Sequence, residues 1–206
     1  LDKREASAFF VERERPGFRI EAGYKTMAGQ SHTGNIHLEN CHIPAGNLIG
    51  ERGKGLGLAL GRITVNRLLH CPAMLGLARL AFDDSRAHAL KRKQFGQPIA
   101  AFQLIQGMLA DMKTEALAAK ALTMETARKR DAGESVTMEA AAAKYFASEM
   151  VGRVADKAVQ IFGGAGYTAD HGIERLYRDV RIFRIYEGTS QIQQVVIARE
   201  TLKRGG

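Results

Sequence analysis

The spacing of apolar side chains along the chain changes near residue 50. Residues 9–23 form an apolar run that a Pro-Gly pair interrupts, and in residues 35–40 apolar and polar side chains alternate. A period of two predicts β-strands with one buried face. Residues 43–55 are rich in turn-forming residues and therefore predict a boundary, so we expect strands over residues 1–50.

Three later segments have apolar residues spaced three and four positions apart, which is the period of an α-helix. The first contains Leu68, Cys71, Leu75, Ala78 and Phe82, the second Phe102, Ile105, Leu109, Met112, Ala116 and Ala119, and the third Phe146, Met150, Val154, Ala158 and Ile161. Each segment is expected to bury one face. Because the connections between the segments are short, we expect antiparallel packing.

Residues that favour helix ends set the limits of these segments. Gly133 and Ser135 predict a stop and a start between the second and third helices. The glycines of residues 162–167 can adopt positive φ, so they predict the end of the third helix. Residues 172–183 predict a short fourth helix.

A last helix is predicted over about residues 190–203, because Ser190 and Gln193 match the S-x-x-Q capping box. Together the elements predict a mainly α fold. Its main part is an up-and-down helical bundle over residues 51–206, preceded by strands over residues 1–50. An isolated pair of strands is marginal in water, so we expect these strands to complete their sheet with chain outside this sequence.

The composition is that of a globular protein. The chain has 206 residues, of which 45% are hydrophobic, enough to bury a core. No apolar run approaches the ~18 residues needed to cross a bilayer, so no membrane span is expected. Two cysteines, Cys41 and Cys71, are too few for a disulfide scaffold. The start of the chain has neither an initiator Met nor a signal pattern, so we expect an internal fragment.

The net charge of +8 is compatible with anionic partners. The basic residues are dispersed, however, and the two clusters, at 91–93 and 128–130, lie near expected helix ends, where cations offset the helix dipole. The sequence has few aromatic residues for base stacking and no helix-turn-helix or zinc signature. Nucleic-acid binding is therefore not the favoured interpretation.

Two familiar patterns fail on inspection. The glycine-rich run over residues 53–61 lacks the third glycine of a dinucleotide fingerprint, since Leu58 stands there, and it lacks the Ser or Thr of a phosphate loop after Lys54. Cys41-His42 and His70-Cys71 are adjacent pairs, whose side chains point to different faces of a strand or helix. We therefore expect no metal site.

Three motifs carry the functional signal. They are "RKQFG" at 92–96, "QIFGGAGY" at 160–167 and "YEGTSQIQ" at 186–193. Their order and spacing, together with the "GNLIGERGKGLGLAL" run at 46–60, resemble the acyl-CoA dehydrogenase family. These flavoenzymes introduce a double bond between the α and β carbons of acyl-CoA thioesters. The resemblance covers essentially the whole chain and implies that residues 1–50 are the C-terminal strands of a truncated β-barrel domain.

The resemblance places the catalytic base on Glu187, which would remove the α proton of the thioester. This proton is weakly acidic, so the carbonyl must be polarised while a base is held close to the carbon. A backbone N–H of the Glu187–Gly188 turn can supply that polarisation, and exclusion of water by the acyl chain strengthens the base. The substrate contacts implied are Tyr186, Gly188 and Arg67, with Arg62 as the competing choice for the CoA contact.

The cofactor implied by the resemblance is FAD. The residues that match contacts to the FAD of a neighbouring subunit are Arg92, Gln103, Gln160, Ile161, Phe162, Gly163 and Gly164, and those that match contacts to the chain's own flavin are Thr189, Ser190 and Gln191. A homodimer or homotetramer is therefore expected. An arginine fits a pyrophosphate because its planar group makes two charge-assisted hydrogen bonds. The electron acceptor implied is an electron-transferring flavoprotein.

The sequence departs from its relatives in three respects. In the isovaleryl and long-chain branches the base is a Glu just before the first-helix arginine, where this chain has Asn66, so Glu187 is the only candidate that a motif supports. Many relatives have an Asp where Thr64 stands, which weakens the assignment of Arg67. The family's N-terminal helical domain is missing, so we expect this piece alone to bind FAD poorly and to turn over little substrate.

Two alternatives remain open. An acyl-CoA oxidase would share the fold and the base but would pass electrons to oxygen. In a different class, the chain could be a basic helical bundle without flavin that binds protein or nucleic acid. The sequence indicates neither the length of the acyl chain nor the compartment, and a bacterial cytoplasm and a mitochondrial matrix fit equally.

Overall fold

The computed structural model describes residues 5–30 and 33–204. The chain forms two compact units, Leu1–Ile63 and Thr64–Gly206. The predicted fold class is confirmed, because a helical bundle follows a set of short strands. None of the described helices has a stretch that is both long enough and apolar enough to cross a membrane.

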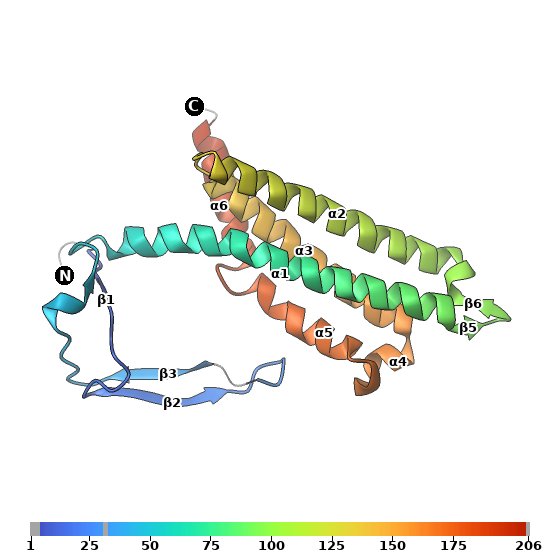
Figure 1. The fold of residues 1–206 in the computed structure, drawn as a ribbon, viewed down its shortest axis with the longest axis horizontal. Helices are drawn as coiled ribbons and strands as arrows, with labels where there is room; N and C mark the ends of the chain where they lie inside the picture. Colours follow the sequence, from blue (N-terminus) through green and yellow to red (C-terminus); the bar gives the residue numbers. More distant parts are fainter. Residues whose placement is uncertain (1–4, 31–32, 205–206) are drawn as a thin grey trace. The chain divides into compact units, whose positions relative to one another are not determined.

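The first unit contains two antiparallel strand pairs. Strand β1 (Ala8–Phe9) pairs with β4 (Leu48–Ile49), and β2 (Phe18–Tyr24) pairs with β3 (Thr33–Leu38) in a hairpin (Figure 1). A 3-10 turn, η1 (Ala45–Asn47), precedes β4, and the long helix α1 (Gly55–Lys91) starts in this unit. The strands lie within the range that alternation predicted.

The prediction that these strands bury one face is wrong for the described chain. On the β2–β3 hairpin, Ile36 is 63% exposed and Leu38 is 58% exposed. Ile20, directly opposite Ile36, is also exposed. The alternation of the side chains is present, but a two-stranded hairpin has no second layer to cover its apolar side.

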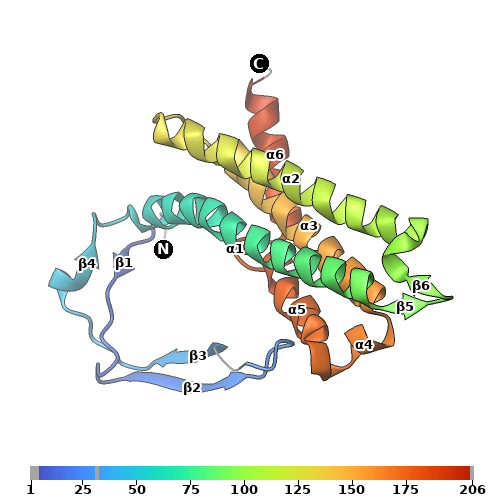
Figure 2. The same ribbon diagram turned by 45° about the vertical axis from the view of Figure 1, so that its right-hand side comes forward.

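The second unit is built from helices. Figures 1 and 2 show its three long helices, α1, α2 (Gln103–Asp131) and α3 (Thr137–Phe162), running along one another. The remaining segments are the β5–β6 hairpin (Lys93–Gln94 and Gln97–Pro98), η2 (Ile99–Ala101), α4 (Gly164–Tyr167), η3 (Ala169–His171), α5 (Ile173–Val180), η4 (Arg181–Arg184) and α6 (Ser190–Arg204). The three helices that the apolar stripes predicted are confirmed.

Helix α3 is the central helix of the second unit, because α2, α5 and α6 all pack on it. Its buried face consists largely of alanines, which let neighbouring helices approach closely. Met74 of α1, Met112 of α2 and Met150 of α3 fill the space between them in the core. Burial of the apolar side chains of this core supplies the main driving force for folding of this unit.

The helix ends follow the sequence only in part. The third helix ends at Gly163, which has φ 60°, as its glycine predicted. The predicted start at Ser135 is wrong, because the residue that precedes the helix is Val136 and no side chain caps the helix there. The β5–β6 hairpin was not predicted. It turns at Phe95 and Gly96, which both have positive φ, as two-residue hairpin turns require.

Candidate active site

The segment between η4 and α6 contains two consecutive residues with positive φ. Glu187 has φ 54° and Gly188 has φ 86°. Glycine adopts this conformation freely, whereas a glutamate does so at a cost of about 1 kcal/mol. Strain of this kind persists only when surrounding contacts hold it, and it is concentrated at functional sites.

Buried side chains hold this turn through its two carbonyl groups. The Gly188 carbonyl accepts hydrogen bonds from Lys144 Nζ (2.8 Å) and from Gln193 Nε2 (2.8 Å). The Glu187 carbonyl accepts from Gln193 Nε2 (3.0 Å) and Arg67 Nε (3.4 Å). Lys144 and Gln193 are fully buried and Arg67 is nearly so. The turn is therefore fixed from inside the bundle.

Burial also perturbs the cations that hold the turn. It lowers the pKa of Lys144 from 10.5 to about 8, and the neighbouring Arg67 guanidinium acts in the same direction. The pKa of Arg67 is lowered as well, chiefly by burial, although the Glu187 carboxylate opposes the change. Two cations in one interior are stable here because their donors meet carbonyl oxygens and because Glu187 is close.

The start of α6 differs from the predicted capping box. Thr189, not Ser190, precedes the first helical residue, and its hydroxyl accepts a hydrogen bond from the Ile192 N–H (3.3 Å). The Ser190 hydroxyl instead donates to Glu149 Oε1 (2.7 Å) on α3. The capping-box prediction is wrong because Thr189 caps the helix one residue earlier, and the Gln193 amide nitrogen donates to the Glu187–Gly188 turn.

The Glu187 carboxylate faces α1. Asn66 Nδ2 lies 3.4 Å from Glu187 Oε1, and His70 Nε2 lies 3.7 Å from the same oxygen. The side chain of Glu187 remains 21% exposed. The carboxylate therefore has polar neighbours on one side and an open approach on the other, as a base that must reach a substrate requires.

Tyr186 is the other neighbour of His70. The Tyr186 hydroxyl lies 3.0 Å from His70 Nδ1, and the two rings are 4.6 Å apart. Burial raises the pKa of Tyr186 to about 12, and the Glu187 carboxylate adds to this effect. The phenol therefore keeps its proton at neutral pH.

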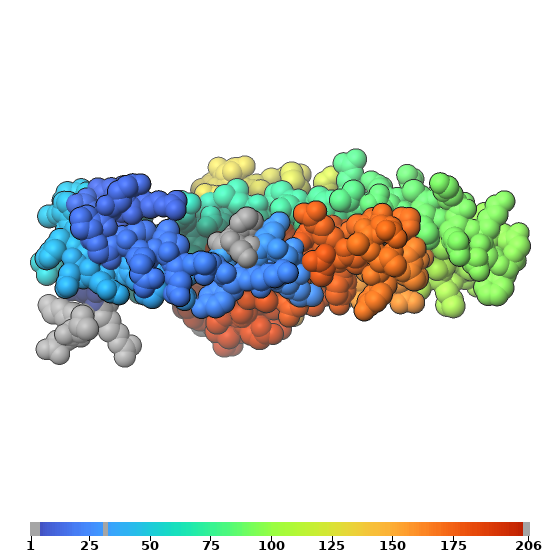
Figure 3. Space-filling model, turned by 90° about the horizontal axis from the view of Figure 1, so that it is seen from below, coloured from blue at the N-terminus to red at the C-terminus, as the bar shows by residue number. Residues whose placement is uncertain are grey.

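A second cluster of predicted residues lies at the far end of α1. A hollow of about 580 Å³ is lined by His88, Lys91, Arg92, Lys93, Phe162, Gly164, Ala165 and His171. Figure 3 shows the green residues near the end of α1 beside the orange residues that follow α3, the two segments that line this hollow. The rings of His88 and Phe162 are stacked at 4.0 Å, and burial lowers the pKa of His88. The hollow combines flat rings with three cations.

The structure therefore brings some predicted residues together and leaves others apart. Arg92, Phe162 and Gly164 share this second hollow, whereas Gln103 and Gln160 are exposed and do not line it. Ile161 is buried in the core, and Gly163 is exposed at the helix end.

The first cluster of predicted residues surrounds the Glu187–Gly188 turn. In it, Tyr186 and Glu187–Gln191 are contiguous, with Gln191 exposed. Arg62, the alternative to Arg67, is exposed in the first unit.

The two clusters are far apart. His70 and Lys91 both lie on α1, 21 positions apart, which at 1.5 Å per residue is about 30 Å. The two clusters have no residue in common. Each cluster therefore has to be considered as its own binding region.

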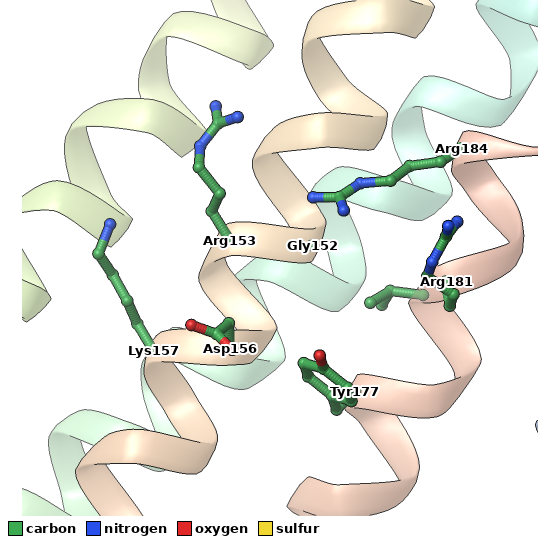
Figure 4. Close-up of a pocket in the computed structure, with 8 residues that line it drawn as sticks. Gly152, Arg153, Asp156, Lys157, Tyr177, Arg181 and Arg184 are labelled. Carbon is green, nitrogen blue, oxygen red and sulfur yellow. The ribbon is translucent and has the colours of Figure 1, made fainter. Parts of the chain in front are cut away.

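A further hollow, of about 340 Å³, lies between α3 and α5 with η4 (Figure 4). Several charged side chains that line it contact other residues of the protein. Arg184 passes over Gly152, which has no side chain to block it. Arg153 and Lys157 point to a neighbouring helix and pair with Glu115 at 2.7 and 3.5 Å. None of the predicted site residues lines this hollow.

Four residues that contact Glu187 or its turn were not assigned to the site from the sequence. They are Asn66 and His70 on α1, Lys144 on α3 and Gln193 on α6, although Gln193 ends the third motif. One signal was available for Lys144, because it stands at a core-facing position in an alanine-rich helix and buried lysines are rare unless they have a partner. Sequence periodicity gave no comparable signal for His70.

A strained turn that presents a carboxylate, with a cation-rich hollow elsewhere on the same bundle, is typical of an enzyme's active site. A family model described as the C-terminal domain of acyl-CoA dehydrogenase matches residues 53–202. The chain belongs to the acyl-CoA dehydrogenase family.

Individual relatives agree with the family model. The chain is 43% identical over 198 residues to a Bacillus subtilis protein described as a probable acyl-CoA dehydrogenase, covering 96% of this chain and 52% of the relative. It is 44% identical over 199 residues to the acryloyl-CoA reductase (NADH) of Anaerotignum propionicum, covering 96% and 50%. The solved butyryl-CoA dehydrogenase of Megasphaera elsdenii superposes with a TM-score of 0.92 at 37% identity, over 96% of this chain and 52% of that chain. The chain thus spans about half the length of these relatives.

Proposed function

We propose that the polypeptide carrying this chain catalyses FAD-dependent α,β-dehydrogenation of an acyl-CoA thioester to the trans-2-enoyl-CoA, with Glu187 as the base. The observation that carries the proposal is the left-handed conformation of Glu187, held by buried donors while its carboxylate stays accessible. Residues 51–206 would form the catalytic bundle, and residues 1–50 would belong to a β domain. The active protein would be a homodimer or homotetramer.

The arrangement of the turn suits proton abstraction next to a carbonyl. Among the described residues, the N–H groups of Glu187 and Gly188 donate to no protein group, while both carbonyls are tied inward. These free N–H groups can stabilise negative charge that develops on the thioester oxygen. Glu187 takes the α proton on its carboxylate, and Tyr186 and Gly188 border the acyl group beside it.

The residues present fit the charge and shape of FAD. The cations at 91–93 suit a pyrophosphate, and the His88–Phe162 stack offers a flat surface beside Gly164, where a side chain would meet nothing within 4 Å. Thr189 and Gln191 would contact a flavin at the other cluster, whereas the buried side chains of Ser190 and Ile161 would not. The remaining predicted contacts are Gln103, Gln160 and Gly163, with Phe162 and Gly164 in the cation-rich hollow. FAD, when bound, supplies the hydride acceptor.

The distance between the clusters supports an oligomer. Because about 30 Å of α1 separates Lys91 from His70, the two clusters would contact different flavins. One of these flavins would then belong to a neighbouring subunit, as family members arrange it. We further propose an electron-transferring flavoprotein as the electron acceptor, in line with the family.

The proposal is tested by mixing the whole natural polypeptide that contains this chain, loaded with FAD, with acyl-CoAs of varied length without oxygen. The oxidised flavin band is expected to bleach with at least one of them. Glu187→Gln removes the base but keeps the shape, so bleaching is expected to slow by at least about 100-fold. Equilibrium binding of the thioester is expected to persist.

The matched control is Glu134→Gln, because Glu134 is an exposed carboxylate in the loop between α2 and α3. Its bleaching rate is expected to equal that of the parent. If Glu187→Gln also bleached at the parent rate, Glu187 would not be the base. Peroxide release on admission of air would indicate the oxidase instead.

A second candidate is the reverse reaction. The relative from Anaerotignum propionicum is described as an acryloyl-CoA reductase, at 44% identity. In that direction a protonated Glu187 would deliver a proton to the α carbon. Supplying an enoyl-CoA with a reduced electron donor, and comparing the rate with that of dehydrogenation, decides which direction dominates.

A further inference from the structure

His70 lies between two residues of the proposed site. Its Nδ1 faces the Tyr186 hydroxyl at 3.0 Å and its Nε2 faces Glu187 Oε1 at 3.7 Å. The ring thus joins two consecutive residues of the strained turn from a different helix. The acyl-CoA dehydrogenase motifs that identify the chain do not include this position.

The surroundings of the ring select one neutral tautomer. Tyr186 keeps its proton because its pKa is raised to about 12, so its hydroxyl can donate to His70 Nδ1. The ring proton then resides on Nε2, which points at the Glu187 carboxylate. Asn66, one helical turn earlier on the same face of α1, directs its Nδ2 at the same oxygen.

We propose that His70 is a positioning residue for Glu187, whose Nε2–H, oriented by Tyr186, holds the carboxylate aimed at the substrate carbon. The inference rests on the proposed function and adds a second residue to it. At 3.7 Å the contact is longer than a hydrogen bond, so the carboxylate can still move. Catalytic contacts of this kind shorten when substrate binds.

Other charged or titratable groups also lie near Glu187 and must be held constant in a test. They are Arg67 on α1, Lys144 on α3 and the neutral Tyr186 beside it, while Arg199 on α6 acts on Arg67. Lys144 and Arg67 reach the carbonyls of the turn, not the carboxylate. Substitution of His70 leaves all of these groups in place.

Two amide side chains separate positioning from packing. In His70→Gln the amide nitrogen can replace Nε2 and still donate to Glu187. In His70→Asn the shorter side chain can replace only Nδ1, so it reaches Tyr186 but not Glu187. Both are uncharged and polar, and Leu69→Gln places the same amide at the neighbouring exposed position as a control.

The readout is exchange of the α hydrogens of acyl-CoAs with D₂O, which reports proton removal without flavin reduction. It is measured by NMR at neutral pH in the whole polypeptide. The substrates are acetyl-CoA and 3,3-dimethylbutyryl-CoA, which have no β hydrogens to transfer, and a longer acyl-CoA. The exchange rate is expected to fall by about ten-fold in His70→Asn, because the carboxylate loses one oriented donor. His70→Gln and Leu69→Gln are expected to keep the parent rate. Equal losses in His70→Asn and His70→Gln would overturn the inference.

A second readout does not depend on turnover. In protein labelled with ¹⁵N-histidine, His70 is expected to show the Nε2–H tautomer, and Tyr186→Phe is expected to shift it toward a mixture. An Nδ1–H tautomer in the parent would overturn the inference. If the parent exchanged no α hydrogen from any thioester, the proposed function would fail, whereas the tautomer would still decide whether Tyr186 and His70 orient Glu187.

Discussion

Lys144 is the residue on which the geometry of the turn depends most. It is a fully buried cation whose ammonium group reaches across from α3 to the Gly188 carbonyl. Gln193 meets the same carbonyl, so the turn has two donors from two helices. Removal of either donor would leave a buried carbonyl with one partner, a cost of about 1 to 3 kcal/mol at most.

The lowered pKa of Lys144 predicts how stability changes with pH. Between pH 8 and 10.5 the unfolded chain keeps a proton that the folded chain has released, so the free energy of unfolding rises with pH in this window. Cys71 opposes this from pH 9 upward, because burial raises its pKa from 9.0 to about 11. The rise should therefore be clearest between pH 8 and 9. Lys144→Met is expected to abolish it.

The measurement is urea unfolding followed by circular dichroism at several pH values. Lys120→Met is the control, because Lys120 is an exposed lysine on α2 and its removal should leave the rise intact. An undiminished rise in Lys144→Met would show that the folded protein keeps Lys144 protonated throughout this window.

At the residue scale, the sequence indicated Glu187 as a candidate, because a motif contains it, but not the residues that hold its turn. Lys144 and Gln193 could not be assigned, since their role depends on the side of a helix that faces the turn, and this follows only from packing. The capping-box prediction failed because Ser190 bonds to Glu149 on another helix and Gln193 bonds to the carbonyls of the preceding turn.

At the element scale, α4 is a single turn packed tightly on the end of α3. A side chain at Gly166 would begin 2.7 Å from the Val159 carbonyl oxygen and 2.8 Å from Phe162 Cβ. Both are closer than van der Waals contact allows, and the carbonyl belongs to a rigid helix. Gly166 therefore fixes the approach of the two elements beside the cation-rich hollow.

Gly166→Ala is expected to destabilise the protein by about 1 to 3 kcal/mol, the usual cost of overpacking. Gly164→Ala, in the same turn, would meet nothing within 4 Å and is expected to change stability by less than about 0.5 kcal/mol. Chemical denaturation of both variants provides the comparison. Equal stabilities would mean that α4 moves away from α3 without cost.

The helices were predictable because their apolar stripes have the correct period and the bundle core uses those stripes. The β5–β6 hairpin was not, since it is only four paired residues long and its turn places Phe95 at a positive φ that the residue type does not favour. The exposed hairpin of the first unit shows the reverse error. Alternation predicted strands correctly but implied a cover that the described chain does not supply.

At the scale of the whole molecule, the chain contains one complete core and one open set of strands. The bundle buries its own apolar face, whereas β2 and β3 expose theirs. The relatives that match are about twice as long. The sequence alone could identify the family, but it could not show which surfaces a longer polypeptide or a second copy covers.

We expect this chain by itself to bind FAD at least about ten-fold more weakly than the whole natural polypeptide that contains it. Each flavin would lose contacts from the remaining chain, and tenfold corresponds to only about 1.4 kcal/mol. Equilibrium dialysis of the two proteins measures the difference. Equal affinities would show that the contacts needed for FAD all lie within these residues.

The positive φ of Glu187 sets thermal stability against the proposed catalysis. Glycine or asparagine adopts that backbone conformation at lower cost than glutamate, and neither carries a carboxylate. A laboratory selection that rewarded only survival at high temperature would therefore favour replacement of Glu187, and on the proposed function its products would be more stable but inactive. Stabilising substitutions are better sought elsewhere on the bundle.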